Sequence, residues 1–238
     1  MDKKAWTIAK INLRVSNVLM FATFNVLLAL VISNFANFAA MSGAAGHGTD
    51  ISPANAFWLL PVMVGIAIPA YNFRRIMNLG GKRSSFLWGS LVTYVILAAA
   101  VSFLVTLSNF TIEPLLERHE YYSPSFLGGI ANLAEVFGWA QRGFIIAFFQ
   151  QFAFLLLFAT FVHTLTAAQG KWYGWVASVG VIVVISVFTP IPVLRRALVW
   201  FFNMILFHPN ALVQILFCLV LAAGVYALSK PVFARKAI

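Results

Sequence analysis

The apolar segments of this sequence contain very few side chains that can do chemistry. Its six long apolar runs contain no Asp, Glu, Lys or Arg, although proton transfer and cation binding inside a membrane normally require ionisable residues. Apart from Cys218 and the tyrosines, His163 is the only titratable side chain in these runs. We interpret His163, which has Thr160 and Thr164 as helical neighbours, as a hydrogen-bonded packing or interfacial residue rather than a catalytic one. HExxH, GxSxG and CxxC motifs do not occur either, so we expect no catalytic residue, metal site or cofactor in this chain.

Uncharged polar residues are the remaining candidates for a pathway through a membrane. Asn25 and Asn34 fall in the first apolar run, and Gln150 and Gln151 fall in the fourth. Such residues either hydrogen-bond between helices or line a cavity, and one sequence does not separate these two roles. We favour the structural role for each residue and keep all four as candidates for lining a cavity.

A basic segment, residues 71–86, follows the second apolar run. Its Gly-Gly-Lys sequence at residues 80–82 is similar to part of a phosphate-binding loop. The motif GxxxxGK[ST], however, requires a glycine and a hydroxyl where this chain has Ile76 and Arg83, so no nucleotide site is expected. The pattern predicts instead a basic amphipathic turn of helix, a Gly-Gly break, and Ser84 as the N-cap of the next helix.

The elements that must position these residues are helices in a membrane. Of the 238 residues, 62% are apolar, 9% are charged and 24 are phenylalanine, and no water-soluble surface can be built from such a composition. Apolar runs of about 20 residues without alternation favour helices over a closed barrel. We therefore predict an all-α integral membrane protein with six transmembrane helices. The predicted spans are 15–39, 56–73, 87–107, 144–168, 172–191 and 211–228.

The distribution of Lys and Arg predicts how these spans are oriented, because cations that flank a span are retained on the cytoplasmic side. With the N-terminus inside, twelve cations fall in cytoplasmic segments and four fall outside, whereas five of the six acids fall outside. We expect a multi-pass protein of the cell membrane with both termini in the cytoplasm. The net charge of +10 follows from this bias and from attraction to membrane lipid, and no nucleic-acid partner is needed to explain it.

The N-terminal segment, residues 1–14, is predicted to be a cytoplasmic interfacial helix preceding a six-span domain, residues 15–238. Lys3, Lys10 and Arg14 share one helical face. An apolar face beside it is formed by Trp6, Ala9 and Leu13. The alternative is a disordered basic tail.

Two segments on the predicted outer side do not read as simple spans. Residues 197–207 are strongly apolar, but at about 1.5 Å per residue they reach only about half-way across the hydrocarbon. We predict a re-entrant or interfacial helix there. Residues 125–141 mix apolar residues with Gly and Glu, and we expect them to lie on the outer membrane face or to cap the spans.

The basic segment resembles the loop between the second and third spans of exporter-type permeases of the type-two ABC transporter family. In those proteins a short helix is followed by a Gly, a small or polar residue, an Arg or Lys, and an aromatic or apolar residue that enters the next span. Residues 79–86, Leu-Gly-Gly-Lys-Arg-Ser-Ser-Phe, occupy that place here. The layout is similar as well: an N-terminal interfacial helix, six spans, and a short apolar re-entrant segment before the last span.

This resemblance implies a transmembrane permease subunit without ATPase activity. Its expected partners are a separate ATP-binding subunit and a second permease subunit, identical or homologous. In such families the basic helix sits in a groove of the ATPase and transmits its closure to the spans. The residues implied for this coupling contact are Phe73, Arg74, Arg75, Met77, Lys82 and Arg83. A hydrophobic or amphipathic cargo, such as a peptide or a lipid, would suit the apolar span faces.

Two other functions stay open at the level of the sequence. A non-transporting subunit that stabilises or senses within a larger membrane complex explains the absence of charge in the spans equally well. A secondary carrier is disfavoured, because ion-coupling residues are missing and no inverted pair of broken helices is evident.

Overall fold

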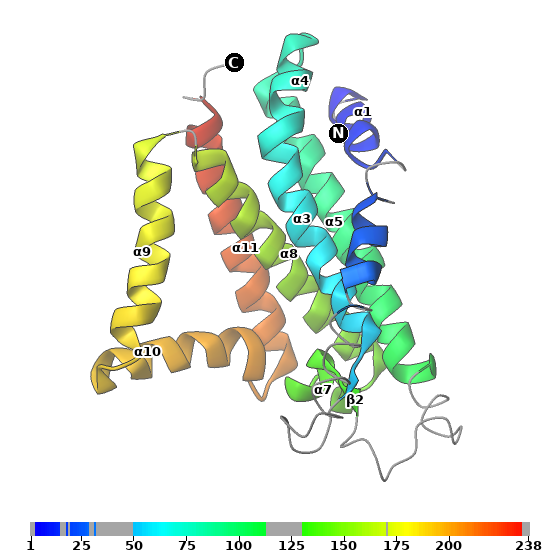
Figure 1. The fold of residues 1–238 in the computed structure, drawn as a ribbon, viewed down its shortest axis with the longest axis vertical. Coiled ribbons are helices and arrows are strands. Elements are labelled where there is room, and N and C mark those ends of the chain that lie inside the picture. The colour runs from blue at the N-terminus through cyan, green and yellow to red at the C-terminus, as the bar shows by residue number, and fades with distance from the viewer. Residues whose placement is uncertain are drawn as a thin grey trace.

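The computed structural model describes residues 3–14, 18, 20–28, 31, 50–112, 130–169 and 171–234. Within these residues the chain is a bundle of helices (Figure 1). The only strands described are β1 (Asp50–Ile51) and β2 (Ile130–Ala131), which form a two-residue parallel pair. The predicted all-α class is therefore confirmed for the described part of the chain.

Four helical segments of the described chain are long and apolar enough to cross a membrane. They are Ala54–Asn78, Arg83–Thr111, Phe144–Ala168 and Ala211–Ala234. A fifth unit pairs Trp172–Phe188 with Pro192–Phe207 at an angle of 118°, which fits a broken span or a re-entrant loop. The protein is thus a multi-pass membrane protein by length and composition. Most of the predicted first span, 15–39, lies outside the described residues, although residues 20–28 are helical.

The first segment is built from four consecutive elements. They are the 3₁₀ turn η1 (Pro53–Trp58), α3 (Leu59–Ala67), the π-turn η2 (Ile68–Asn72) and α4 (Phe73–Asn78). Pro69 lies in the π-turn, where its missing N–H interrupts the α-helical ladder. The chain then returns through α5 (Arg83–Leu107) and a second π-turn, η3 (Ser108–Ile112).

The second half of the chain runs around α8 (Phe144–Ala168). It is preceded by α7 (Leu133–Val136) and the 3₁₀ turn η4 (Ala140–Arg142), and followed by α9 (Trp172–Phe188), α10 (Pro192–Phe202), the π-turn η5 (Asn203–Phe207) and α11 (Ala211–Ala234). Helix α8 packs against α3, α5 and α11 and is therefore central to the bundle (Figure 1). Near its start, the fully buried Trp139 stacks on Trp58 with ring centroids 5.7 Å apart. The described part of the predicted cap, 125–141, thus covers this end of the bundle.

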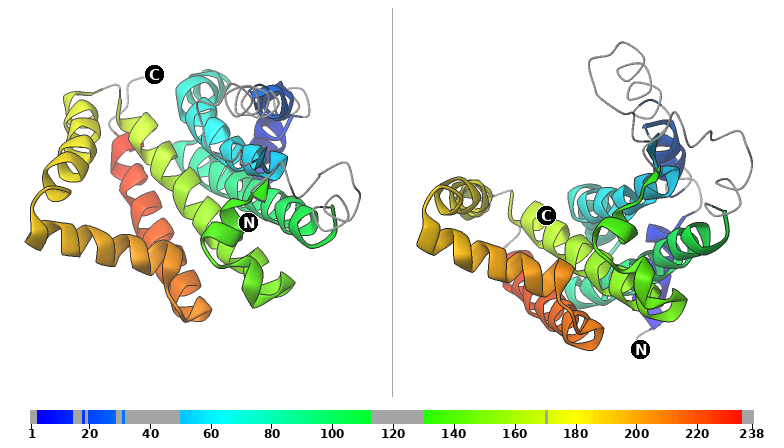
Figure 2. Two further views of the ribbon diagram at one scale, coloured as in Figure 1. Left: turned by 60° about the horizontal axis from the view of Figure 1, so that its bottom comes forward. Right: turned by 90° about the horizontal axis from the view of Figure 1, so that it is seen from below.

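Helices α9 and α10 lie to one side of the bundle formed by α3, α5, α8 and α11 (Figure 2). Gly174 is the only buried residue of α9, and α10 buries none. The predicted re-entrant segment, 197–207, needs correction, because the helix already begins at Pro192. Proline is favoured in the first turn of a helix, so Arg195 and Arg196 lie within α10 rather than before it.

The N-terminal helix α1 (Lys3–Asn12) packs closely on α5. It buries Ala5, Ile8 and Ala9, whereas Trp6 is 42% exposed. The predicted helix is confirmed, but its buried face is turned away from Trp6. The reason is Gly89 of α5, where an added Cβ would lie 2.7 Å from the Ile8 Cγ2 atom and 2.8 Å from the Ala5 carbonyl oxygen.

This close approach predicts opposite effects for two Gly→Ala substitutions. Gly89→Ala is expected to destabilise the protein by about 1–3 kcal/mol, because the added methyl group overpacks the contact with α1. In Gly224→Ala, the new Cβ meets nothing within 4 Å, and the higher helix propensity of Ala stabilises α11 by up to about 1 kcal/mol. Thermal unfolding of both variants in the same detergent measures the difference, and two shifts of equal sign would contradict the close packing.

Charged side chains divide between the two ends of the bundle. The end where α4 stops, α5 and α9 start and α11 stops carries Arg74, Arg75, Lys82, Arg83, Lys171 and Lys230. The opposite end, where β1, β2 and α7 lie (Figure 1), carries both described acids, Asp50 and Glu135, together with three of the described cations, Arg142, Arg195 and Arg196. The cation-rich end is the one that the sequence assigns to the cytoplasm.

Cysteine labelling tests this orientation. In a Cys218→Ala background, Asn78→Cys at the end of α4 and Gln141→Cys in η4 each introduce one exposed thiol. With intact cells, an impermeant thiol reagent is expected to label the cysteine at position 141 at once and the one at 78 only after permeabilisation. Labelling of both positions in intact cells would contradict the opposite placement of the two ends.

Candidate functional site

The basic segment forms a short amphipathic helix, α4, with a sharp division between its faces. Phe73, Ile76 and Met77 are buried, whereas Arg74 and Arg75 are exposed. The predicted amphipathic turn of helix is therefore confirmed. Phe73 is 0% exposed, so it lies inside this chain and supports the loop from beneath.

Two glycines end α4 in a defined geometry. The Gly80 N–H donates to the Met77 carbonyl at 2.9 Å, and the Gly81 N–H donates to the Ile76 carbonyl at 3.0 Å. This pair of bonds, with Gly80 at φ +78°, is a Schellman motif. A Cβ on Gly81 would lie 2.6 Å from the Ile76 Cγ2 atom, so both glycines are required for this turn.

The next helix, α5, begins at Arg83, one residue before Ser84, the predicted N-cap. Its N-cap is Lys82, in an extended conformation and without a side-chain capping bond. Ser84 is the second residue of the helix, and its predicted role as N-cap is wrong. Lys82 and Leu79 are both exposed at the tip of the turn, Leu79 to 76%.

An aromatic cluster beneath α4 joins it to two other helices. The rings of Phe73, Phe86 and Phe233 lie with centroids 4.8–5.3 Å apart. All three are fully buried. They come from α4, α5 and α11 respectively, so a displacement of α4 must be accommodated by both longer helices.

His163 of α8 extends this cluster. Its ring lies 5.4 Å from that of Phe233 and 5.3 Å from that of Tyr226. Its Nδ1 atom shares a hydrogen bond of 2.6 Å with the Tyr94 hydroxyl of α5. The interpretation of His163 as a hydrogen-bonded packing residue is confirmed by this arrangement. Among the described residues, no three His, Cys, Asp or Glu side chains gather as a possible metal site.

Substitution of the central ring measures how strongly the cluster holds the helices together. Phe233→Ala is expected to lower the free energy of unfolding by about 3–5 kcal/mol, as for other buried phenylalanines. Phe149→Ala on α8 removes the same side chain from a position that is 47% exposed, and a change of less than about 0.5 kcal/mol is expected there. Denaturant unfolding in detergent micelles compares the two. Equal losses would mean that the cluster contributes no more than a lipid-facing ring.

A polar network connects the base of α4 to the N-terminal helix. The Asn72 amide donates to the Asn12 side-chain oxygen at 2.9 Å, and the Asn12 amide donates to the Thr93 hydroxyl at 3.4 Å. These residues belong to η2, α1 and α5. Asn12 and Asn72 do not stand out in the sequence, because asparagine near a helix end is common and nothing in the pattern pairs the two.

Two of the four polar residues proposed as cavity lining, Gln150 and Gln151, form hydrogen bonds between helices. The Gln150 amide donates to the Gln214 oxygen of α11, and the Gln214 amide donates to the Ile205 carbonyl at 2.6 Å. Gln151 accepts from the Thr106 hydroxyl at 3.4 Å. Asn25 is buried, and Asn34 lies outside the described residues. For the two glutamines, the structural role is the one that these contacts favour.

A wholly apolar chamber separates the bundle from α9 and α10. Its volume is about 780 Å³, and its lining side chains come from α8, α9, α10, η5 and α11. Phe158, Val181 and Phe202 are examples from three of its sides. This volume falls in the range of small-molecule sites, roughly 300–1,000 Å³, but no polar group is present to orient a ligand.

Comparisons with known proteins give no match. No protein-family model matches the sequence, and neither curated proteins nor solved structures include a similar one at a significant level. The functional assignment therefore depends on the loop and on the layout of the helices.

Proposed function

We propose that this chain is the transmembrane permease subunit of an ATP-driven exporter, with a separate ATP-binding subunit as its partner. The observation that carries the proposal is the combination of exposed and buried residues in the loop. Arg74, Arg75 and Lys82 are exposed at the cation-rich end, while the same turn is held from beneath by the buried rings of Phe73, Phe86 and Phe233. A loop that transmits the movement of a partner needs exposed side chains to bind that partner and buried side chains to connect the loop to the spans.

The exposed part of the loop has the chemistry of a protein-binding surface. Arginine and aromatic residues are enriched in such surfaces, whereas lysine is depleted. Tyr71, exposed to 75%, and Leu79, exposed to 76%, lie beside Arg74 and Arg75; neither was singled out from the sequence. In the proposed complex, Arg74, Arg75 and Lys82 contact the ATPase with these two residues, and Phe73 and Met77 transmit the displacement to α5 and α11.

The transport pathway in this proposal lies between two permease subunits in a six-span, both-ends-inside topology. Gln150 and Gln151 line neither the apolar chamber beside α9 and α10 nor the two hollows beside α5. The apolar chamber beside α9 and α10 fits a hydrophobic cargo or the apolar part of an amphipathic one. Exposed apolar surface on both helices is available for a second subunit.

A non-transporting subunit of a larger membrane complex is the second candidate. It is favoured by the hydrogen bonds that pair Gln150 with Gln214 and Gln151 with Thr106 inside the described bundle, because a protein that only docks needs no polar route. The exposed arginines would then serve a different cytoplasmic partner.

Exchange of the two loop arginines distinguishes docking from a general effect of charge. Arg74→Gln with Arg75→Gln removes charge-assisted hydrogen bonds, each worth about 1.5–3 kcal/mol at a protein interface. Losing one such bond weakens the complex about tenfold or more. We expect unchanged membrane insertion and reduced co-purification of the proposed ATP-binding subunit, together with reduced transport-coupled ATP hydrolysis.

The matched control is the other adjacent arginine pair, Arg195→Gln with Arg196→Gln. These arginines are also exposed, but they lie in α10 near its start, at the end opposite to the loop. Co-purification at the wild-type level is expected for this control. Equal loss in both double variants would exclude a specific dock at the loop.

A further inference from the structure

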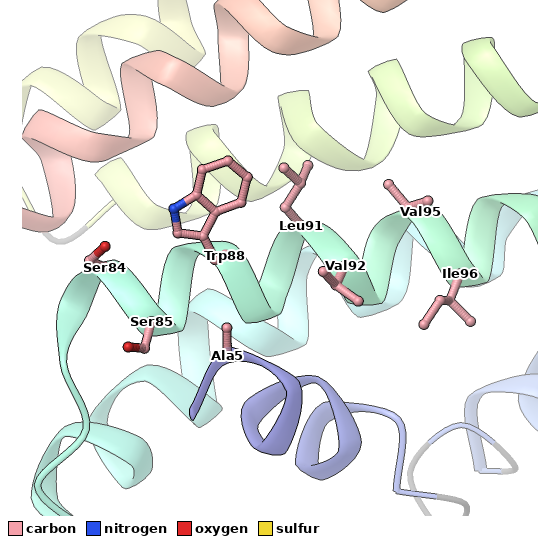
Figure 3. Close-up of a pocket in the computed structure, with 8 residues that line it drawn as sticks. All are labelled: Ala5, Ser84, Ser85, Trp88, Leu91, Val92, Val95 and Ile96. Atoms are coloured by element: carbon pink, nitrogen blue, oxygen red, sulfur yellow. The ribbon is translucent and has the colours of Figure 1, made fainter. Parts of the chain in front are cut away.

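A second, separate feature of the cation-rich end is a groove between α5 and α11, with α8 beneath it. Its volume is about 720 Å³. Leu91 and Val95 line it from α5, Leu219 and Ala223 from α11, and Leu156 from α8. In Figure 3, which draws the neighbouring pocket between α1 and α5, Trp88 and Leu91 project from the side of α5 opposite to α1. Trp88 therefore lies at the boundary of both hollows and lines each of them.

Two cationic side chains stand at one end of this groove. Arg83 is the first residue of α5, and its guanidinium donates a hydrogen bond to the Ala234 carbonyl in the last turn of α11. This bond places the charge between the two helices. Lys230 of α11 is exposed and lines the same end. The described residues that line the groove include no acid, so the charged side chains at this end of the groove are both cationic.

From its cationic end to its apolar end, the groove is about as long as one leaflet of a bilayer. Residues 83 and 95 of α5 are separated by about 18 Å along the helix at 1.5 Å per residue. Half of a hydrocarbon core about 30 Å thick is about 15 Å. The groove therefore has a positive end at the membrane surface and an apolar path that reaches close to the middle of the membrane.

We propose that this groove binds one anionic phospholipid of the cytoplasmic leaflet. The lipid phosphate lies beside Arg83 and Lys230, and one acyl chain lies along Leu91, Val95 and Leu219. Basic pockets between spans on the cytoplasmic side are suited to anionic headgroups, because attraction to the cations adds to burial of the chain. The chamber beside α9 and α10 would not distinguish anionic from neutral lipids, because no charged residue lines it. The lipid site does not depend on the proposed function in transport.

Native mass spectrometry of the purified full chain tests the proposal. The probes are phosphatidylglycerol and phosphatidylcholine with identical acyl chains, and glycerol 3-phosphate as a headgroup without chains. We expect the wild type to retain phosphatidylglycerol in preference to phosphatidylcholine. Lys230→Gln should weaken that binding about tenfold, through loss of one charge-assisted contact. Lys171→Gln, which removes an exposed cation at the same end but outside the groove, should bind as the wild type does.

A groove-filling variant tests the apolar part. Ala223→Phe places a ring where the acyl chain would lie, and Ala227→Phe does the same one turn further along α11. At least one of these variants should no longer bind phosphatidylglycerol while its thermal unfolding transition is unchanged. Equal binding of both lipids, or wild-type binding by Lys230→Gln and both filled variants, would overturn the proposal. So would displacement of the lipid by equimolar glycerol 3-phosphate, which indicates a free phosphate site. A filled variant that alters the oligomeric state instead would identify the groove as an interface between copies.

Discussion

Hydrogen bonds between side chains of different helices hold this bundle in one arrangement. Apolar side chains pack against lipid nearly as well as against one another, so apolar contact alone does not select a unique helix pairing in a membrane. Besides their apolar contacts, the described helices are joined at a few polar points. Gln150 meets Gln214, Tyr94 meets His163, and Asn12 meets Asn72. Each pair links two different helices, and leaving one partner unpaired in a medium without water would be costly.

The loop at the cation-rich end depends on these same bonds. Asn72 immediately precedes α4, and His163 packs on Phe233 beneath it. The short helix α4 has only six residues, too few to be stable alone. Its position is therefore set by the long helices around it, and any partner that displaces it acts on the whole bundle.

Sequence patterns predicted which residues are helical far better than which faces meet. The amphipathic division of α4 and its Gly-Gly end follow directly from the spacing of Phe73, Ile76, Gly80 and Gly81. The buried face of α1 does not follow from its sequence. The spacing places Trp6 on the apolar face, but Gly89 of α5 leaves room for a close contact with Ala5 and Ile8, so Trp6 stays exposed. Periodicity relates residues on one helix, whereas the contact partner belongs to another helix distant in sequence. The six-span count stays a prediction, since most of residues 15–39 lies outside the described chain.

The π-turn before α4 has a further consequence for how this loop can change through insertion and deletion. The Phe73 N–H bonds the Ile68 carbonyl five residues back, so η2 accommodates one residue more than an α-helical turn would. Removing one residue there would restore the regular ladder and leave the residues on either side in nearly the same angular relation, because the bulge already absorbs the extra residue. A single-residue deletion in the regular part of α3 would instead rotate everything after it by about 100° and carry the ring of Phe73 away from its buried partners. The bulge is therefore a place where the chain can lose one residue without changing which side chains of α4 are buried and which are exposed.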